Sequence, residues 1–312
     1  MKKLLLITLT IVAISIFSCN KKDTIATTTK SGTTGPYTSL SSVFSTMMPI
    51  AVTATIDATK GGSVYGPNGT RFIFNPYSLV TASGSLATGS VQVKVTDYLS
   101  KGDMIFSGIL PYSSGDPLFS GGEVNVIASQ GGSPLHLAYN TYFTANMPFG
   151  GTPTPGLRCF IGKSISDTGQ NKVNWAMSQD SLSGVCYNGD TVNIISDSLG
   201  LCNADRFMSS PNYQTFTVKI TGVTMSSTDQ AQAFVLYDNY KGVWPLLSFN
   251  SSPTNYVEHH VPNIPVHIVI FAIVNGNFYG GTLGVTPSTG STYTVNVTQT
   301  DPISFKALVN TL

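Results

Sequence analysis

The chain has 312 residues, of which 41% are hydrophobic and only 10% are charged, and its formal net charge is +1. The hydrophobic fraction is large enough to form a core, which excludes disorder over the whole length. Ser, Thr, Asn and Gly must supply much of the polar surface, and these poor helix formers argue against helical bundles and coiled coils. Because basic residues are not in excess, we expect no nucleic-acid partner.

The N-terminus has the features of a bacterial lipoprotein signal. Two lysines precede an apolar run at residues 4–17 that is short for a membrane span. The run ends at Ser18 and Cys19, and this order of a small residue and a cysteine resembles the site at which lipoproteins are cleaved and acylated. We therefore expect residues 1–18 to be removed and Cys19 to carry the lipid that anchors the chain to the outer membrane. The alternative is an ordinary signal peptide with an incidental cysteine, and the sequence leaves the periplasmic or surface side open.

Residues 19–49 are rich in Thr and Ser, which predicts a flexible linker behind the lipidated cysteine. Short apolar runs separated by Gly, Pro, Asn and Asp follow, a pattern typical of a β-sandwich. The clearest strand is at residues 91–96, where three valines alternate with polar residues, so one face is buried and the other is solvated. We assign residues 50–150 to a first β-sandwich domain, with further strands expected at 52–56, 71–74, 123–128 and 141–147.

The sequence GGTPTPG at residues 150–156 predicts a linker, and we place a domain boundary between residues 150 and 151. Residues 151–312 then form a second β-rich domain, in which residues 233–237 and 243–246 predict a hairpin. The apolar run at residues 266–273 predicts a central strand covered on both faces. Other strands are expected at 157–161, 192–195, 215–220, 278–285 and 292–297. Asp301 and Pro302 predict the start of a short C-terminal helix, the one helix expected in the mature all-β chain.

Several segments resemble known proteins. Residues 61–76, GGSVYGPNGTRFIFNP, share a Gly pair, a Pro-x-Gly turn and a strand ending before proline with the sandwich domain of zonula occludens proteins and netrin receptors. Residues 101–105 (KGDMI), 120–122 (SGG) and 199–207 (LGLCNADRF) resemble uncharacterised outer-membrane lipoproteins of Bacteroidota type that carry this domain. The resemblance implies an envelope location and, from the animal domains, an interaction module without an established activity.

The sequence contains no motif of the common enzyme classes. It has no Gly-x-Ser-x-Gly elbow, His-Glu-x-x-His helix, P-loop or Gly-x-Gly-x-x-Gly turn. Glu123 and Glu258 are its only glutamates, and no spacing of carboxylates indicates a glycosidase. We therefore expect no catalytic activity, with a hydrolase as the minority alternative.

His259, His260 and His267, with Glu258 beside them, are the strongest metal-ligand candidates. Neighbouring residues on a strand point to opposite faces, whereas a metal site needs converging ligands. We interpret these histidines as turn or strand-edge residues and expect neither a metal nor another cofactor.

Four aromatic residues are candidates for a platform that stacks on sugar rings: Trp175, Trp244, Tyr237 and Tyr240. With only two tryptophans in the chain, we prefer to interpret them as core residues. An exposed aromatic cluster rimmed by polar loops would favour a binding function, and a large flat apolar patch would favour a scaffold.

Asp205 and Arg206 could form a recognition pair, because the planar guanidinium suits carboxylate ligands. Since neighbours on a strand diverge, we expect each of them to make a separate structural contact instead. Neither residue is assigned to a site on sequence grounds.

Cys159, Cys186 and Cys202 would face an oxidising compartment after export. Three thiols allow three pairings, of which Cys159 with Cys186 is our first choice, and three free thiols are the alternative. Cys202 is expected to be buried as a small apolar residue.

Together these observations predict a non-catalytic envelope lipoprotein that binds envelope or extracellular polymers, glycans or proteins. The alternative is a structural or accessory spacer within an envelope complex.

Overall fold

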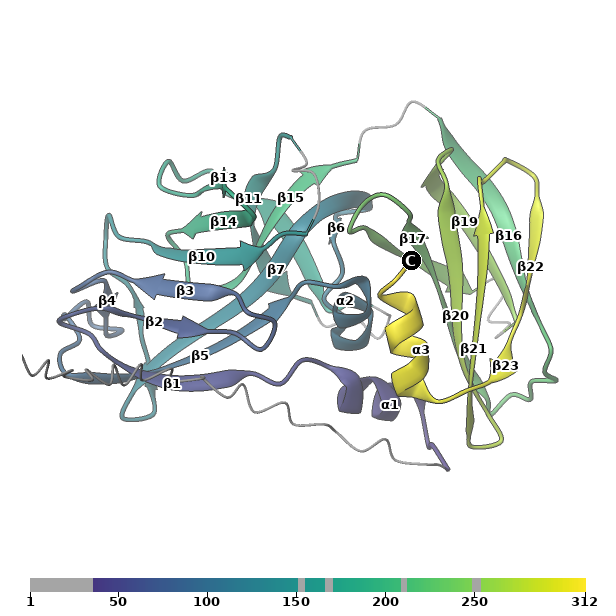
Figure 1. Cartoon of the computed structure of the whole chain (residues 1–312), viewed down its shortest axis with the longest axis horizontal. Coiled ribbons are helices and arrows are strands. Elements are labelled where there is room, and N and C mark those ends of the chain that lie inside the picture. The colour runs from purple at the N-terminus through teal and green to yellow at the C-terminus, as the bar shows by residue number, and fades with distance from the viewer. Residues whose placement is uncertain (1–35, 151–154, 166–170, 209–211, 249–253) are drawn as a thin grey trace, which may run out of the picture. The chain divides into compact units, whose positions relative to one another are not determined.

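Figure 1 shows the computed structural model of the chain, which describes residues 36–150, 155–165, 171–208, 212–248 and 254–312. Strands dominate these residues, so the expected all-β, sandwich-like fold is confirmed. The expected signal peptide at residues 1–18 and the expected lipidation site Cys19 lie outside the described residues.

Two sheets form the first sandwich. Sheet 1 has eight strands, in the order β1 (Val52–Asp57), β5 (Ser90–Tyr98), β7 (Asp116–Gln130), β15 (Gly200–Phe207), β11 (Arg158–Ser164) and β12 (Val173–Met177), with β6 (Tyr112–Ser113) and β8 (Ser133–Pro134) paired to β7. Sheet 2 has five, in the order β13 (Gly184–Asn188), β14 (Thr191–Ser196), β10 (Phe143–Pro148), β3 (Arg71–Phe74) and β2 (Gly62–Tyr65). A separate short pair joins β4 (Leu79–Val80) to β9 (His136–Leu137).

The first core lies between sheets 1 and 2. The alternation predicted for residues 91–96 is present in β5, where Val91, Val93 and Val95 are buried while the residues between them are exposed up to Lys94. Phe72 of sheet 2 enters the same core. Because each such apolar side chain contributes roughly 1.5–3 kcal/mol when it is fully buried, the alternating pattern holds the two sheets face to face.

Sheet 3 contains eight strands, in the order β22 (Thr292–Asn296), β16 (Tyr213–Thr221), β19 (Asn255–Pro262), β18 (Val243–Ser248), β17 (Gln230–Tyr237), β20 (Val266–Val274), β21 (Asn277–Val285) and β23 (Thr298–Gln299). The predicted hairpin is confirmed, since β17 and β18 pair in antiparallel. The predicted central strand is β20, which lies between β17 and β21 and has eight of its nine residues buried. Val218 of β16 and Ile268 of β20 meet in another core, so sheet 3 curves around its own apolar face.

The expected domain boundary between residues 150 and 151 is wrong, because the strands on its two sides belong to the same sheets. β10 lies before the boundary and pairs with β14 from Phe143 opposite Ser196 to Pro148 opposite Thr191. β7 likewise pairs with β15 in sheet 1. Gly and Pro at this point mark a loop between strands, and the change to sheet 3 falls later, between β15 and β16. Residues Gly32–Leu312 form one compact unit.

The described part of the chain contains three helices, α1 (Leu40–Met47), α2 (Lys101–Ser107) and α3 (Pro302–Val309). α3 begins as predicted, with Asp301 as its N-cap and Pro302 in its first turn. The expectation of a single helix is wrong, because α1 and α2 also form. None of these helices is long and apolar enough to cross a membrane.

The prediction of a flexible linker over residues 19–49 is wrong for the last part of this range, which contains α1. The Ser39 side chain accepts from the Ser42 amide and the Ser42 side chain accepts from the Ser39 amide, a capping box that begins the helix. Leu40 and Phe44 are four residues apart, share one helix face and are buried. Burial of this face fixes residues that composition alone assigned to a linker.

The three helices pack in a middle core between sheet 1 and sheet 3, near the centre of Figure 1. Trp175 of sheet 1, Phe271 of sheet 3 and Phe44 of α1 belong to this core, and the rings of Phe44 and Phe271 meet edge to face at 5.3 Å. An ion pair of 2.7 Å between Lys306 Nζ and Asp103 Oδ1 joins α3 to α2. The two halves of the compact unit therefore share apolar packing.

Candidate functional site

Two loops at the β4 end of the first sandwich are tied together by hydrogen bonds (Figure 1). The amide of Ala138 donates to the carbonyl oxygen of Ser78 at 2.9 Å, and Oγ1 of Thr141 donates to the same oxygen at 3.3 Å. β4 and β9 pair beside these contacts. The loops at residues 75–78 and 138–142 are therefore held in a fixed relation by the strands beneath them.

These loops expose three tyrosines, which we call the tyrosine cluster: Tyr77, Tyr139 and Tyr142. Their exposed fractions are 54%, 92% and 36%. A tyrosine ring in water offers a flat apolar face and a hydroxyl that can donate or accept a hydrogen bond. Three such rings stand on two adjoining loops, where aromatic side chains are available to a ligand.

The backbone of the cluster adopts an uncommon conformation at two positions. Tyr77 has a φ of 57° and Asn140 has a φ of 56°, both in the left-handed region that non-glycine residues seldom occupy. The amide of Tyr77 donates to the carbonyl oxygen of Ala58 at 2.8 Å, which fixes the ring-bearing residue to the end of β1. Backbone strain of this kind is concentrated at binding and active sites, where the fold compensates for it.

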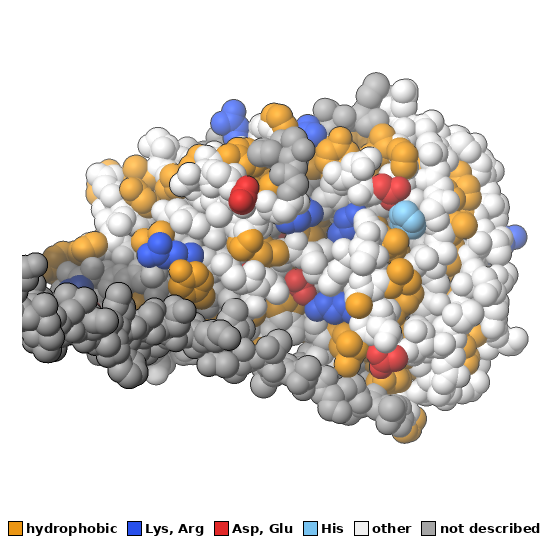
Figure 2. Space-filling view, in the orientation of Figure 1, with side chains coloured by type: hydrophobic (Ala, Val, Ile, Leu, Met, Phe, Trp, Pro, Cys, Tyr) orange, Lys and Arg blue, Asp and Glu red, His pale blue; other side chains and the backbone are white. Residues whose placement is uncertain are grey.

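Charged side chains are few on the face of the molecule shown in Figure 2, as the 10% charged composition predicts. With 10% of its residues charged, the chain offers a ligand little charge attraction. Stacking on aromatic rings together with neutral hydrogen bonds is the chemistry that the tyrosine cluster offers.

The four aromatic residues considered from the sequence do not form an exposed platform. Trp175, Trp244 and Tyr237 are buried, and the indole Nε1 of Trp175 donates to the carbonyl oxygen of Leu110 at 2.8 Å. Tyr240 stacks on the ring of Phe119 with 4.0 Å between the ring centroids. Their interpretation as packing residues is confirmed, and the exposed tyrosines lie elsewhere.

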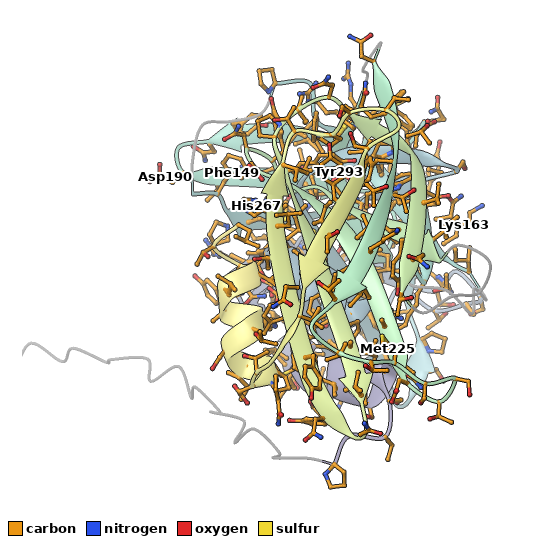
Figure 3. All side chains as sticks on the ribbon, turned by 90° about the vertical axis from the view of Figure 1, so that its right-hand side faces the viewer. Phe149, Lys163, Asp190, Met225, His267 and Tyr293 are labelled. Atoms are coloured by element: carbon orange, nitrogen blue, oxygen red, sulfur yellow. The ribbon has the colours of Figure 1, made fainter. Side chains whose placement is uncertain are left out.

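Among the histidine candidates, the structure describes the side chain of His267 but not those of its two neighbours on another strand. His267 lies on β20 of sheet 3 (Figure 3), and its Nδ1 is 2.7 Å from Oδ1 of Asp238. His259 and His260 lie in β19, and their side chains are outside the described part of the structure. No group of three or more His, Cys, Asp or Glu side chains able to hold a metal occurs among the described residues.

Asp205 and Arg206 make separate contacts, as expected. The guanidinium of Arg206 lies 4.8 Å from the centre of the Phe119 ring. Asp205 is fully buried and accepts a hydrogen bond from Nδ2 of Asn203. Burial raises the pKa of Asp205, and burial together with the nearby charge of Asp205 raises the pKa of Glu123. The carboxyl groups of Glu123 and Asp205 therefore lie near each other in a part of sheet 1 that is closed to solvent.

The expected bridge between Cys159 and Cys186 is not formed in the structure, in which all three cysteines are free thiols. Cys159 is buried in the first core, whereas Cys186 is exposed on β13 of sheet 2. Cys202 is fully buried, which confirms its expected role as a small apolar residue. Burial raises the pKa of Cys159 to about 12, which disfavours the thiolate form that reacts with electrophiles.

The sequence did not predict the tyrosine cluster, because its three tyrosines belong to turns that are distant in the chain and no tryptophan lies beside them. Tyr77 and Tyr139 are 62 positions apart, and only the pairing of β4 with β9 brings their loops together. A signal was available in their neighbours, since Pro76 before Tyr77 and Asn140 after Tyr139 are typical of turns. Tyrosines in turns are more often exposed than those in apolar runs.

Comparisons with known proteins do not assign the chain to a family. No protein-family model matches its sequence, and no curated protein matches it significantly. The resemblance to the sandwich domain of zonula occludens proteins and netrin receptors therefore stays a prediction.

Proposed function

We propose that the chain is a non-catalytic lipoprotein of the bacterial cell envelope that binds a neutral glycan polymer through the tyrosine cluster. The observation that carries this proposal is the exposure of Tyr77, Tyr139 and Tyr142 on two loops fixed to one sandwich. Unlike a single exposed ring such as Tyr65, three rings on adjoining loops offer a ligand several faces on which to stack.

The chemistry of the surface supports a glycan over a charged ligand. Sugar rings present apolar C–H faces and neutral hydroxyl groups, which match tyrosine ring faces and tyrosine hydroxyls. The low charge of the chain favours a neutral polymer, because the protein has few charged side chains with which to attract an oppositely charged one. Preformed loops reduce the ordering entropy that binding must overcome.

The anchoring part of the proposal rests on the N-terminal sequence. Ser18 and Cys19 stand at the end of a signal-like apolar run, so the mature chain begins with a lipidated cysteine at the outer membrane. Replacing Cys19 with alanine should abolish labelling by a palmitate analogue and release the chain from membranes. Labelling of Cys19→Ala at the level of the parent would contradict the anchor.

The binding part is tested by co-sedimentation of the full-length chain with insoluble neutral polysaccharides and by a glycan array. We expect the parent to bind a neutral glycan and the triple variant Tyr77→Ala/Tyr139→Ala/Tyr142→Ala to bind at least tenfold more weakly, since stacking on each ring contributes about 0.5–1.5 kcal/mol.

Tyr65→Ala is the matched control, because Tyr65 is 60% exposed on β2, opposite Arg71 at the other end of the β2–β3 pair from the cluster. It should bind like the parent. A parent chain that binds no glycan, or a triple variant that binds as tightly as Tyr65→Ala, would contradict the proposal and would favour a spacer.

A further inference from the structure

A row of buried polar side chains crosses sheet 1 at the middle of β7 and β15. Glu123 of β7 stands opposite Asn203 of β15, and Asp205 follows two residues later, opposite Ser120. Glu123, Asn203 and Asp205 are fully buried, and Ser120 is 4% exposed. Nδ2 of Asn203 donates to Oδ2 of Asp205, so the Asn203 amide lies beside the Asp205 carboxylate. Asn203 also stands opposite Glu123 in the strand pairing.

Four oxygen atoms in this row have no hydrogen-bond donor among the described residues. They are both carboxylate oxygens of Glu123, Oδ1 of Asn203 and Oδ1 of Asp205. Folded proteins pair nearly all buried polar atoms, because an unpaired one loses its hydration without compensation. Four unpaired acceptors on one small patch of sheet therefore indicate a shared partner that supplies positive charge.

The basic residues beside the row are Arg206 and Lys241, whose charged groups lie over the rings of Phe119 and Phe149 at 4.8 and 5.0 Å from the ring centres. Lys101 Nζ donates to the carbonyl oxygens of Tyr237 and Leu312, and Lys306 Nζ pairs with Asp103. No ion pair involving Glu123 or Asp205 occurs among the described residues. Two partners remain: a proton on the carboxyl groups, which their raised pKa values favour, and a cation from solution, which alone would make the stability of the fold respond to added metal.

We propose that Glu123, Asn203 and Asp205 form a calcium-binding site within sheet 1. Carboxylate and amide oxygens are the ligands that hard cations prefer, and two carboxylates neutralise a divalent ion. Magnesium retains several of its water molecules, whereas this row is closed to solvent, so calcium fits it better. The hydroxyl of Ser120 accepts from the amide of Gly122 at 3.0 Å and hydrogen-bonds to Asp205, so it supports the Asp205 carboxyl and is not counted among the ligands.

The site is tested by thermal unfolding of the full-length chain after removal of metal with EDTA. Calcium at a hundredfold excess over its Kd should raise the unfolding temperature of the parent by roughly 5 °C, and magnesium should raise it less. Glu123→Gln and Asp205→Asn keep the shape of each side chain but remove its charge, and both should lose the response to calcium. In the parent alone, terbium luminescence should titrate to one ion per chain and be displaced by calcium.

Asp97→Asn is the matched control, because the carboxylate of Asp97 is buried in the same sheet but already accepts from the amides of Asn68 and Thr70 at 2.9 and 3.0 Å. It should retain the full response to calcium. The proposal is overturned if calcium leaves the parent's unfolding temperature unchanged, if the parent binds no terbium, if magnesium acts as strongly as calcium, or if both Glu123→Gln and Asp205→Asn respond like the parent.

Discussion

Nζ of Lys101 donates a hydrogen bond of 2.6 Å to the carbonyl oxygen of Tyr237, which lies 136 positions further along the chain. Lys101 begins α2 next to the first sandwich, and Tyr237 ends β17 of sheet 3. This contact joins α2 to sheet 3, so the two halves of the chain are held by a specific polar bond as well as by the apolar packing of the middle core. It also places an ammonium group where little water reaches it, since Lys101 is 8% exposed.

The burial of Lys101 makes stability depend on pH. Burial lowers the pKa of its ammonium group to about 8, and the nearby charge of Asp238 offsets part of this effect. Between pH 8 and the ordinary lysine pKa of about 10.4, the unfolded chain binds more protons at this residue than the folded chain, so its contribution to stability rises with pH. We expect urea unfolding to show the parent gaining up to about 3 kcal/mol relative to Lys101→Met from pH 7.5 to pH 10. A constant difference between the two proteins over this range would contradict the buried contact.

Cutting the chain at the former boundary should not separate it into two bodies. A specific protease site inserted between Gly150 and Pro155 falls between strands whose partners lie on both sides, as β10 with β14 and β7 with β15 show. We expect the cleaved chain to elute as one species in size-exclusion chromatography and to separate only in denaturant. Two folded fragments that separate in native buffer would show that the halves have independent cores.

Sequence patterns predicted most strands of the first sandwich and of sheet 3 because alternating or continuous apolar runs encode burial directly, as at Val91, Val93 and Val95. The same patterns could not show which strands are neighbours. The pairing of β10 with β14 spans a Gly and Pro segment that looks like a boundary, and α2 is a short helix whose seven residues are all buried, including Lys101 and Asp103. Composition assigns such polar residues to the surface, and only the tertiary contacts reveal otherwise.

The tyrosine cluster escaped prediction for a related reason, since exposure and long-range pairing are set by the assembled sheets. Glu123 and Asp205 were visible in the sequence as isolated acids, 82 positions apart. The pairing of β7 with β15 brings these two acids close together, and no local sequence pattern specifies that pairing.

Replacing Tyr77 with glycine distinguishes the contribution of its backbone conformation to stability from the contribution of its ring to binding. At a φ of 57°, glycine relieves steric strain but adds flexibility to the unfolded chain, so we expect Tyr77→Gly to unfold within about 1 kcal/mol of the parent. Its glycan affinity should fall because the ring is lost. Urea denaturation measures the first effect, and a loss of more than about 2 kcal/mol would show that the ring packs into the fold.

Alkylation should distinguish the three cysteines of the body in the folded chain. Cys186 is exposed and should react with iodoacetamide within minutes, whereas Cys159 and Cys202 are buried and should react only after unfolding. Peptide mass spectrometry before and after addition of guanidinium chloride measures this order. Modification of Cys159 at the rate of Cys186 under native conditions would contradict the first core, and a disulfide between these two residues would contradict the free thiols.

The central claim is that a glycan contacts the three rings of the tyrosine cluster. Its most direct test is nitration of the full-length chain by tetranitromethane with and without the bound polymer, read by peptide mass spectrometry at each tyrosine. We expect the polymer to protect Tyr77, Tyr139 and Tyr142 while Tyr65 is modified equally in both samples. Equal modification of the three rings with and without the polymer, or protection confined to Tyr65, would contradict the account.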